Sequence, residues 1–157
     1  LNHVFYYQLG SAHERAGQPD QAETCFQKCL ELSPNYADAM NYLGYMWAEL
    51  GIKLDQARTL IEKAVELEPK NAAFLDSLGW VLFKLNQPQE ALAWLLKAVE
   101  NSPEPDPTLY DHLGDIHAAL KEFTQAREAW RKSLGVEPND QIKRKLEAAP
   151  SIERPAP

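Results

Sequence analysis

The chain has 157 residues, of which 45% are hydrophobic and 25% are charged, a composition typical of soluble proteins and sufficient for one domain or an array of small units. No apolar run approaches the ~20 residues of a membrane-spanning helix, and the start of the sequence shows no signal-peptide pattern. The net charge of −7 argues against nucleic acid as the main ligand, because phosphate binding relies on clustered lysines and arginines.

The first predicted element is a pair of helices within residues 3–36, separated by the turn AGQPDQA. The first of these helices carries the pair Leu9-Gly10 in its interior, where glycine costs about 1 kcal/mol relative to alanine. The same Leu-Gly pair recurs three times along the chain, at spacings of 34, 35 and 35 residues. The four glycines are Gly10, Gly44, Gly79 and Gly114. This period predicts stacked helical hairpins over residues 3–36, 37–71, 72–106 and 107–138.

Each repeat carries the same residue types in the same order. With Leu-Gly as positions 7 and 8, positions 4, 7, 8 and 11 form one face of the first helix. The second helix carries an alanine, a bulky residue four places later and a small residue three places beyond that, and a proline closes the repeat. The alanines are Ala22, Ala57, Ala91 and Ala126; the bulky residues are Phe26, Ile61, Leu95 and Trp130; the small residues are Cys29, Ala64, Ala98 and Ser133; the prolines are Pro34, Pro69, Pro103 and Pro138.

The glycine at position 8 has a predicted packing role. Without a side chain there, the first helix can lie very close to the second, and we expect the recurrent alanine to face the glycine. The lost helix propensity is then recovered as buried apolar surface, at ~25 cal/mol per Å². Extra residues in the second hairpin turn and in SPEPDPT are expected to fall in loops.

This pattern resembles the tetratricopeptide repeat, W-x2-L-G-x2-Y…A-x3-F…P at a period of 34. The departures are mild: His13 and His117 replace the usual tyrosine, and Ile61 and Leu95 replace phenylalanine. The resemblance implies an all-α solenoid of four helix-turn-helix repeats. A weaker likeness of YLGY, LDSLGW and DHLGD points to bacterial repeat proteins, several of them associated with the cell envelope. Either the bacterial cytoplasm or the periplasmic side of the envelope therefore fits.

The residues after Pro138 predict a capping helix and a tail. Residues 140–149 can form a short helix with Ile142 and Leu146 on one side and with Lys143, Arg144 and Lys145 exposed. This helix completes a single array over residues 1–149, and residues 150–157 are predicted to be a flexible tail. Cys25 and Cys29 are expected in or near the core rather than in a disulfide or zinc site.

No catalytic or metal site is predicted. His112 and His117 are five residues apart, about 500° around a helix, so they do not project together. Ser77 lies in LDSLG and not in the G-x-S-x-G turn of hydrolases. Neither a phosphate loop nor a dinucleotide fingerprint is present. We therefore expect a non-enzymatic protein without a cofactor or metal.

The face of each first helix opposite the packing stripe is the predicted partner site, because in the resembled family it lines the concave groove. Its sixteen positions hold five acidic, four aromatic and no basic residues. The residues predicted to bind a partner are Tyr7, Ser11, Asp38, Asn41, Tyr45, Asp76, Trp80, Phe83, Asp111 and Asp115. The competing interpretation is that the aromatic residues pack between repeats while the aspartates only keep the surface soluble.

The absence of groove lysines and arginines excludes the carboxylate clamp by which one branch of the family grips chaperone tails. An acidic and aromatic groove favours a protein or peptide segment with Lys or Arg among apolar side chains. The alternative is self-assembly, in which one end of a solenoid stacks on another copy. Leu1 in place of a methionine suggests a piece of a longer chain, with any further repeats upstream.

Overall fold

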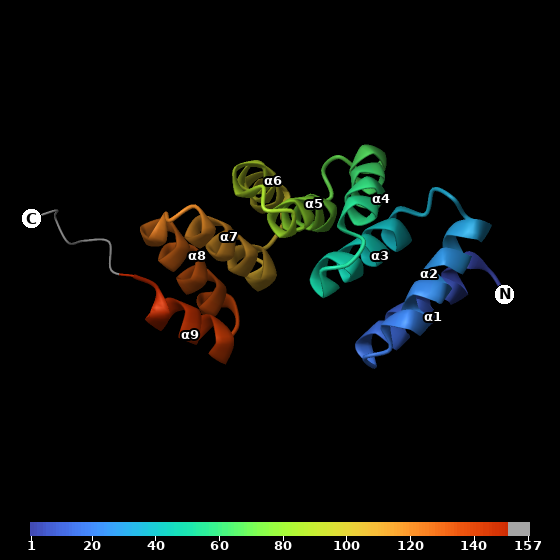
Figure 1. Ribbon diagram of the computed structural model, residues 1–157, viewed down its shortest axis with the longest axis horizontal. Helices are drawn as coiled ribbons and strands as arrows, with labels where there is room; N and C mark the ends of the chain where they lie inside the picture. The colour runs from blue at the N-terminus through green and yellow to red at the C-terminus, as the bar shows by residue number, and fades with distance from the viewer. Residues whose placement is uncertain (151–157) are drawn as a thin grey trace, which may run out of the picture. The chain divides into compact units, whose positions relative to one another are not determined.

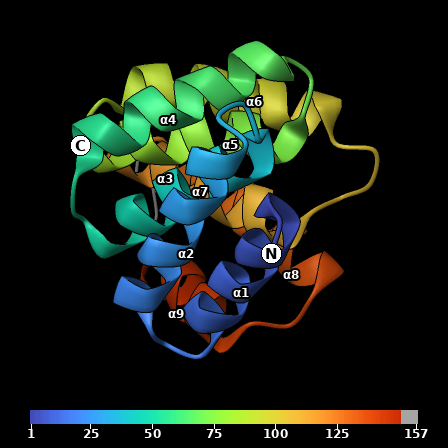
Figure 2. The same ribbon diagram turned by 90° about the vertical axis from the view of Figure 1, so that its right-hand side faces the viewer.

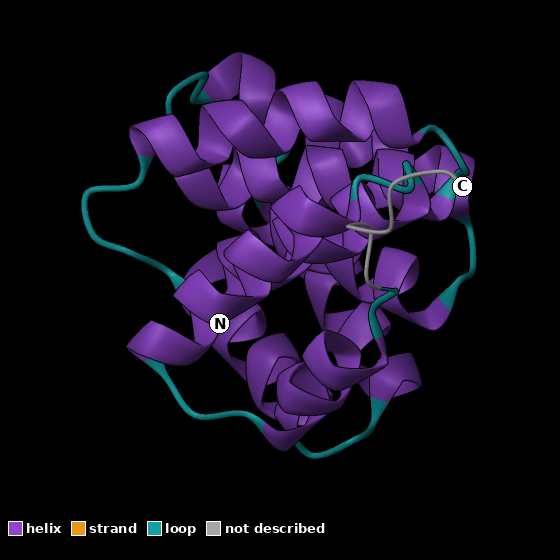
Figure 3. Cartoon of the chain, turned by 90° about the vertical axis from the view of Figure 1, so that its left-hand side faces the viewer, coloured by secondary structure: helices purple, strands orange, loops and turns teal. Residues whose placement is uncertain are grey.

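The structure, a computed structural model, describes residues 1–150, and in this range the chain forms helices and loops without a strand (Figure 3). The all-α prediction is therefore confirmed. The chain divides into two compact units, Leu1–Lys70 and a second unit that begins at Asn71, and each is described by itself. Of the tail predicted over residues 150–157, all but Pro150 lies outside the described residues.

Both units are built from antiparallel helix pairs (Figure 1). The first unit contains α1 His3–Arg15, α2 Pro19–Leu32, α3 Ala37–Leu50 and α4 Leu54–Leu67. The second contains α5 Ala72–Lys84, α6 Pro88–Asn101, α7 Pro107–Ala119, α8 Phe123–Val136 and α9 Asp140–Ala148. The helix pairs fall within the predicted repeat ranges, while the single array over residues 1–149 stays a prediction.

The helix ends follow from local sequence. The second helix of every pair stops two residues before the closing proline, because proline cannot donate to the helix and restricts the residue before it. Four of the other helices begin after an Asn or Asp whose side-chain oxygen accepts a backbone N–H from the first turn. These N-caps are Asn2, Asn71, Asp106 and Asn139.

The turn inside each pair uses left-handed backbone. Gly17, Asn86 and Lys121 have φ of 73°, 63° and 61° at equivalent places. The second turn carries one more residue and uses two left-handed positions, Gly51 and Lys53. The extra residue of that turn therefore lies in a loop, as predicted, and the extra residue of SPEPDPT lies between α6 and α7.

The glycine contacts confirm a close approach and correct its partner. A Cβ built on Gly79 would lie 2.1 Å from Leu95 Cδ2 and 3.1 Å from the Ala91 carbonyl oxygen. At Gly44 the nearest atom would be Cγ1 of the bulky Ile61, at 2.7 Å. The expectation that the alanine methyl faces the glycine was wrong. The bulky side chain one turn later fills that space, because a glycine leaves room for a whole side chain across the interface.

The recurrent residues of the second helix lie in the core of each repeat, together with residues of the first helix such as Leu43 and Leu75. All four alanines and all four small residues are fully buried at 0% exposure, and the bulky residues are at most 4% exposed. Cys25 and Cys29 are buried free thiols, in agreement with the core assignment. Stability thus depends on a repeated contact between one glycine and one large side chain.

Gly79→Leu is expected to lower the free energy of unfolding by about 1–3 kcal/mol, because the added side chain would overlap Leu95 in a filled core. Gly135→Leu is the matched control: Gly135 lies in α8, and a Cβ there would meet nothing within 4 Å. That variant should be neutral or more stable by up to about 1 kcal/mol, from helix propensity. Urea denaturation measures both, and equal effects would contradict the close-contact account.

Candidate functional site

In the first unit, α1 contacts α3, and this contact brings aromatic side chains of the predicted site together. Figure 2 shows the helices of this unit from the side of the N-terminus. The ring of Tyr7 on α1 meets the rings of Tyr36 and Tyr42 edge to face, with centroids 5.4 Å and 6.2 Å away. Tyr36 precedes α3, so the loop before this helix adds an aromatic ring that sequence reasoning missed. We call Tyr7, Tyr36, Asp38, Asn41 and Tyr45 the tyrosine face.

The tyrosine face is rich in acceptors. Burial and then the charge of Asp38 raise the pKa of the Tyr7 phenol, which places the Asp38 carboxylate close to that ring. Partial desolvation, followed by the charge of Glu68, raises the pKa of Asp38 itself. The buried Oδ1 of Asn41 accepts no hydrogen bond from the described residues. The exposed carboxylate of Asp38 is therefore the acceptor of this face that suits a cationic donor.

The predicted site residue Ser11 and the neighbouring Glu14 of α1 are already engaged. Ser11 is 6% exposed, and its hydroxyl donates to the Tyr7 carbonyl oxygen at 3.0 Å. Glu14 accepts the Tyr42 hydroxyl at 3.0 Å. The structure therefore places Ser11 in the packing between helices rather than on a surface that a partner can reach.

In the second unit, Asp76, Trp80 and His112 form a buried cluster. His112 Nδ1 lies 2.8 Å from Asp76 Oδ1, and the Trp80 ring stacks on the imidazole with centroids 3.9 Å apart. The ring of Phe83 also stacks on Trp80, with centroids 5.0 Å apart. Asp76 and Trp80 are each 6% exposed, so they lie under the surface in this unit.

The electrostatics of the buried cluster favour a charged histidine. Burial alone would lower the pKa of His112, but the hydrogen bond and the charge of Asp76, with Asp111 and Asp115 nearby, outweigh burial and raise it. The contact therefore joins α5 and α7, and its ion-pair character increases as the pH falls. The members of the cluster hold α5 and α7 together, so His112 has a packing role.

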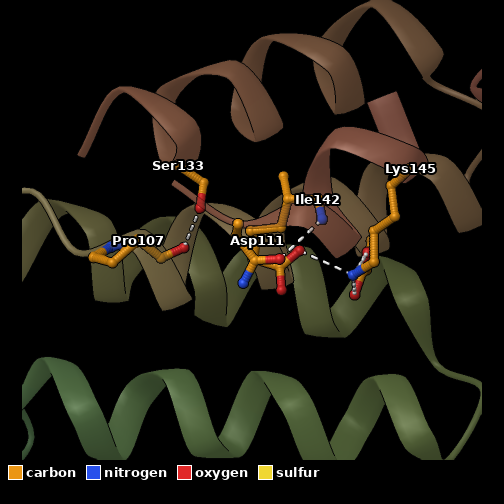
Figure 4. A network of polar contacts seen from close by, with 7 residues as sticks. Pro107, Asp111, Ser133, Ile142 and Lys145 are labelled. Atoms are coloured by element: carbon orange, nitrogen blue, oxygen red, sulfur yellow. Dashed lines mark hydrogen bonds and ion pairs between the residues drawn. The ribbon is translucent and has the colours of Figure 1, made fainter. Parts of the chain in front are cut away.

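Asp111 and Asp115 form an acidic pair on α7, and a lysine of the capping helix α9 binds both carboxylates. Figure 4 shows Lys145 reaching from α9 to these carboxylates. Its Nζ lies 3.0 Å from Asp111 Oδ1 and 2.9 Å and 3.1 Å from the two oxygens of Asp115. The prediction that Lys145 is exposed was wrong, because the acidic pair draws the ammonium group onto α7. The same contacts raise the pKa of Lys145 against the opposing effect of burial.

Apolar packing supports this ion pair. Ile142 is 4% exposed and packs in one cluster with Ala126 and Trp130 of α8. The Asn139 side chain caps α9 by accepting the Ile142 N–H at 3.1 Å, and Arg127 donates to the Pro150 carbonyl oxygen. The cap helix thus forms as predicted, with its apolar side on α8 and one basic side chain on α7.

These contacts share one geometric rule. The sixth residue of one helix meets the fifth residue of the preceding first helix in three cases. The pairs are Tyr42 with Tyr7, His112 with Asp76, and Lys145 with Asp111. The fifth position, which the sequence assigned to partner binding, is therefore also where neighbouring helices of one unit meet.

The described residues contain no group of three or more His, Cys, Asp or Glu side chains placed to hold a metal ion. His117 Nδ1 lies 3.3 Å from Glu122 Oε1 in the turn after α7, apart from the buried His112. No described helix has the length and apolar character needed to cross a membrane.

Comparison with known families assigns the repeats. Models described as tetratricopeptide repeat match residues 3–36, 53–104 and 107–140. Comparison with curated protein sequences gave no match. The resemblance carried by the Leu-Gly, alanine and proline positions is confirmed.

Solved structures of repeat proteins share the fold. TTC0263, a thermophilic TPR protein of Thermus thermophilus, superposes with a TM-score of 0.83 at 21% identity, over 92% of this chain and 79% of that one. PilF of Pseudomonas aeruginosa gives 0.80 at 26% identity, over 92% of this chain and 65% of that one. MamA of Desulfovibrio magneticus RS-1 gives 0.72 at 23% identity, over 92% and 81%. These matches establish a helical repeat fold.

The buried ion pair predicts a pH-dependent stability. Because the folded pKa of His112 is above its ordinary value of 6.5, the stabilisation is complete below that pH and is lost as the pH rises through the folded pKa. Urea denaturation between pH 6 and pH 9 should show falling stability, and His112→Gln should flatten this dependence. An unchanged slope in His112→Gln would show that other groups cause it.

Lys145→Met is expected to lower the free energy of unfolding by about 1 kcal/mol, because it leaves two carboxylates on α7 without their cation. Amide hydrogen exchange in α9 should become faster as the helix loses its anchor. Lys143→Met, on the exposed side of the same helix, is the control and should change neither quantity. Equal effects of the two substitutions would disprove the anchoring role.

Proposed function

Because the chain belongs to the tetratricopeptide repeat family, whose domains bind protein partners, we propose that this protein-interaction scaffold captures a segment with Lys or Arg among apolar side chains. Proteins of this fold are generally scaffolds without catalytic activity. The partner is a protein or peptide, and the proposal assigns no nucleic acid, cofactor or metal to the site.

The contact between Lys145 and the acidic pair is the observation that carries this proposal. An ammonium group on a helix that also buries Ile142 binds two carboxylates of α7 within 3.1 Å. Helix α9 is thus a segment of the proposed kind, with basic and apolar side chains. Its Lys145 binds Asp111 and Asp115, two residues of the predicted partner site. A partner segment of similar chemistry would use the same interactions.

The tyrosine face is the part of the proposed site that the chain leaves accessible. Asp38 is exposed, in contrast with Asp76, which His112 covers, and with Asp111 and Asp115, which Lys145 covers. The half-buried rings of Tyr7 and Tyr36 border it and offer π faces to a cation and flat surfaces to an apolar side chain. We therefore assign first contact with the partner to this face.

The second unit takes a supporting role in the proposal. Trp80 and Asp76 are buried, so a charge introduced at Asp76 would break the pair with His112 and disturb the fold. Phe83 is half-buried beside Trp80. In this unit, partner contact requires either Phe83 or displacement of Lys145 from the acidic pair.

Self-assembly is the competing function, and an exposed aromatic side chain of α1 favours it. Phe5 is 40% exposed. Light scattering over a concentration series separates the two functions. A mass that grows with concentration and returns to the monomer value in Phe5→Ser would replace the partner-binding proposal with association of copies.

Peptides selected from a random display library on the full chain should be enriched in Lys and Arg next to Leu, Ile or aromatic residues. Asp38→Lys should weaken the selected peptides about tenfold or more, because it places a repelling charge on the tyrosine face. Asp20→Lys is the matched control, with an exposed carboxylate at the start of α2. Fluorescence anisotropy of labelled peptides measures the affinities.

Peptides without enrichment in basic residues would contradict the proposal. So would equal affinity for Asp38→Lys, Asp20→Lys and the unchanged chain. The affinities should also fall with added salt, since the contact is partly ionic and accessible to solvent.

A further inference from the structure

The first unit contains a second concave surface, separate from the tyrosine face. This groove has a volume of about 750 Å³ and is formed by α2, α3 and α4. Figures 1 and 2 both show α3 between the other two helices. The residues that line the groove are Gln27, Leu30, Glu31, Leu43, Trp47, Asp55, Gln56, Thr59 and Leu60. We call it the α2–α4 groove.

Apolar side chains form the floor and walls of the α2–α4 groove. Leu43 and Trp47 of α3, which are 1% and 6% exposed, form the floor. Leu30 of α2 and Leu60 of α4 are half-buried and stand on the two sides. Leu43 and Trp47 occupy positions 7 and 11 of the repeat, on the opposite side of α3 from the residues of the tyrosine face.

Polar contacts at one end fix the floor in place. Trp47 Nε1 donates to Glu23 Oε2 at 2.9 Å, and Lys53 Nζ pairs with the other oxygen of Glu23 at 2.6 Å. The same ammonium lies 5.0 Å from the Trp47 ring centroid. The indole is thus held from more than one direction, so the groove is formed before anything binds, which lowers the entropic cost of docking.

The charge around the groove is negative. Its lining includes the carboxylates of Glu31 and Asp55 and no lysine or arginine. Three neighbouring cations are engaged: Lys28 pairs with Glu31 at 3.2 Å, Arg58 with Glu62 at 2.7 Å, and Lys53 with Glu23. Residues 1–70 as a whole carry ten acidic and six basic side chains. A partner with positive charge beside its apolar surface is therefore complementary.

We propose that the α2–α4 groove docks an amphipathic helix of a partner protein, with an apolar stripe on Leu43 and Trp47 and with Lys or Arg beside Glu31 and Asp55. Two helical walls on a helical floor accept the side-chain ridges of one more helix, which is the usual mode of helix-in-groove recognition. Gln27, Gln56 and Thr59 add hydrogen-bonding groups along the walls. This site is independent of the tyrosine face and adds a second binding surface to the scaffold.

A synthetic amphipathic helix of leucine and lysine, labelled for fluorescence anisotropy, tests this proposal on the full chain. We expect it to bind, and a matched peptide of leucine and glutamate to bind at least about tenfold more weakly. Leu60→Gln removes one apolar wall, and Asp55→Lys reverses one lining charge. Each should weaken the leucine–lysine peptide about tenfold.

Two control variants match these substitutions. Leu50→Gln makes the same change at an exposed leucine at the end of α3, and Asp20→Lys makes the same Asp-to-Lys charge reversal at the start of α2, outside the lining. Both should bind the peptide as the unchanged chain does. A second readout does not depend on the folding of a variant. Adding the leucine–lysine peptide to the unchanged chain should shift the NMR signal of the Trp47 indole N–H, because docking changes the environment of that ring.

Several outcomes would overturn the proposal. Equal binding of the two peptides, or no binding, would do so. If Asp38→Lys weakens binding of the leucine–lysine peptide and Leu60→Gln does not, the peptide binds the tyrosine face. That result would support the proposed function and contradict the groove as a docking site. Concentration-dependent association that is lost in Leu60→Gln would show that a second copy covers the groove instead of a partner helix.

Discussion

The close contact between a glycine in one helix and a bulky side chain in the next is the constraint on which the rest of the structure depends. At Gly79 a Cβ would overlap Leu95 at 2.1 Å, and at Gly114 it would lie 2.3 Å from Trp130. Each contact brings two helices together so closely that their other residues must take fixed positions. A fixed helix pair then determines which side chains face the core and which remain for recognition.

The fifth residue of the first helix shows how the same position serves both packing and binding. Asp76 is paired with His112 and Asp111 with Lys145, each at the sixth position of the following helix or cap. An unpaired carboxylate there would repel its acidic neighbours and cost free energy when partly buried. The chain therefore supplies a basic group at both places where its own helices cover a carboxylate at this position. That arrangement explains why an acidic face can exist in a stable repeat.

Periodicity predicted most of the fold and only part of the site. The glycine, alanine and proline positions were enough to place the helix pairs, because one short pattern recurs with little variation. They did not predict that Phe26 or Trp130 faces the glycine. A periodic pattern indicates which residues share a helix face, but not how far each side chain reaches into the neighbouring helix. Nor did helical spacing reveal that Lys145 binds Asp111, because that contact joins side chains 34 residues apart.

The buried position of Trp80 has a similar cause and changes how recognition is understood in this chain. A helical wheel placed Trp80 opposite the packing stripe, yet the imidazole of His112 covers its ring at 3.9 Å. In a repeat protein, the side of a helix that faces away from its own partner still meets the next helix along the array. A wheel alone therefore does not identify an accessible residue such as Asp38, whose side chain is exposed in the structure. The binding surface is therefore determined by side-chain size and charge at each helix contact, and not by helical phase alone.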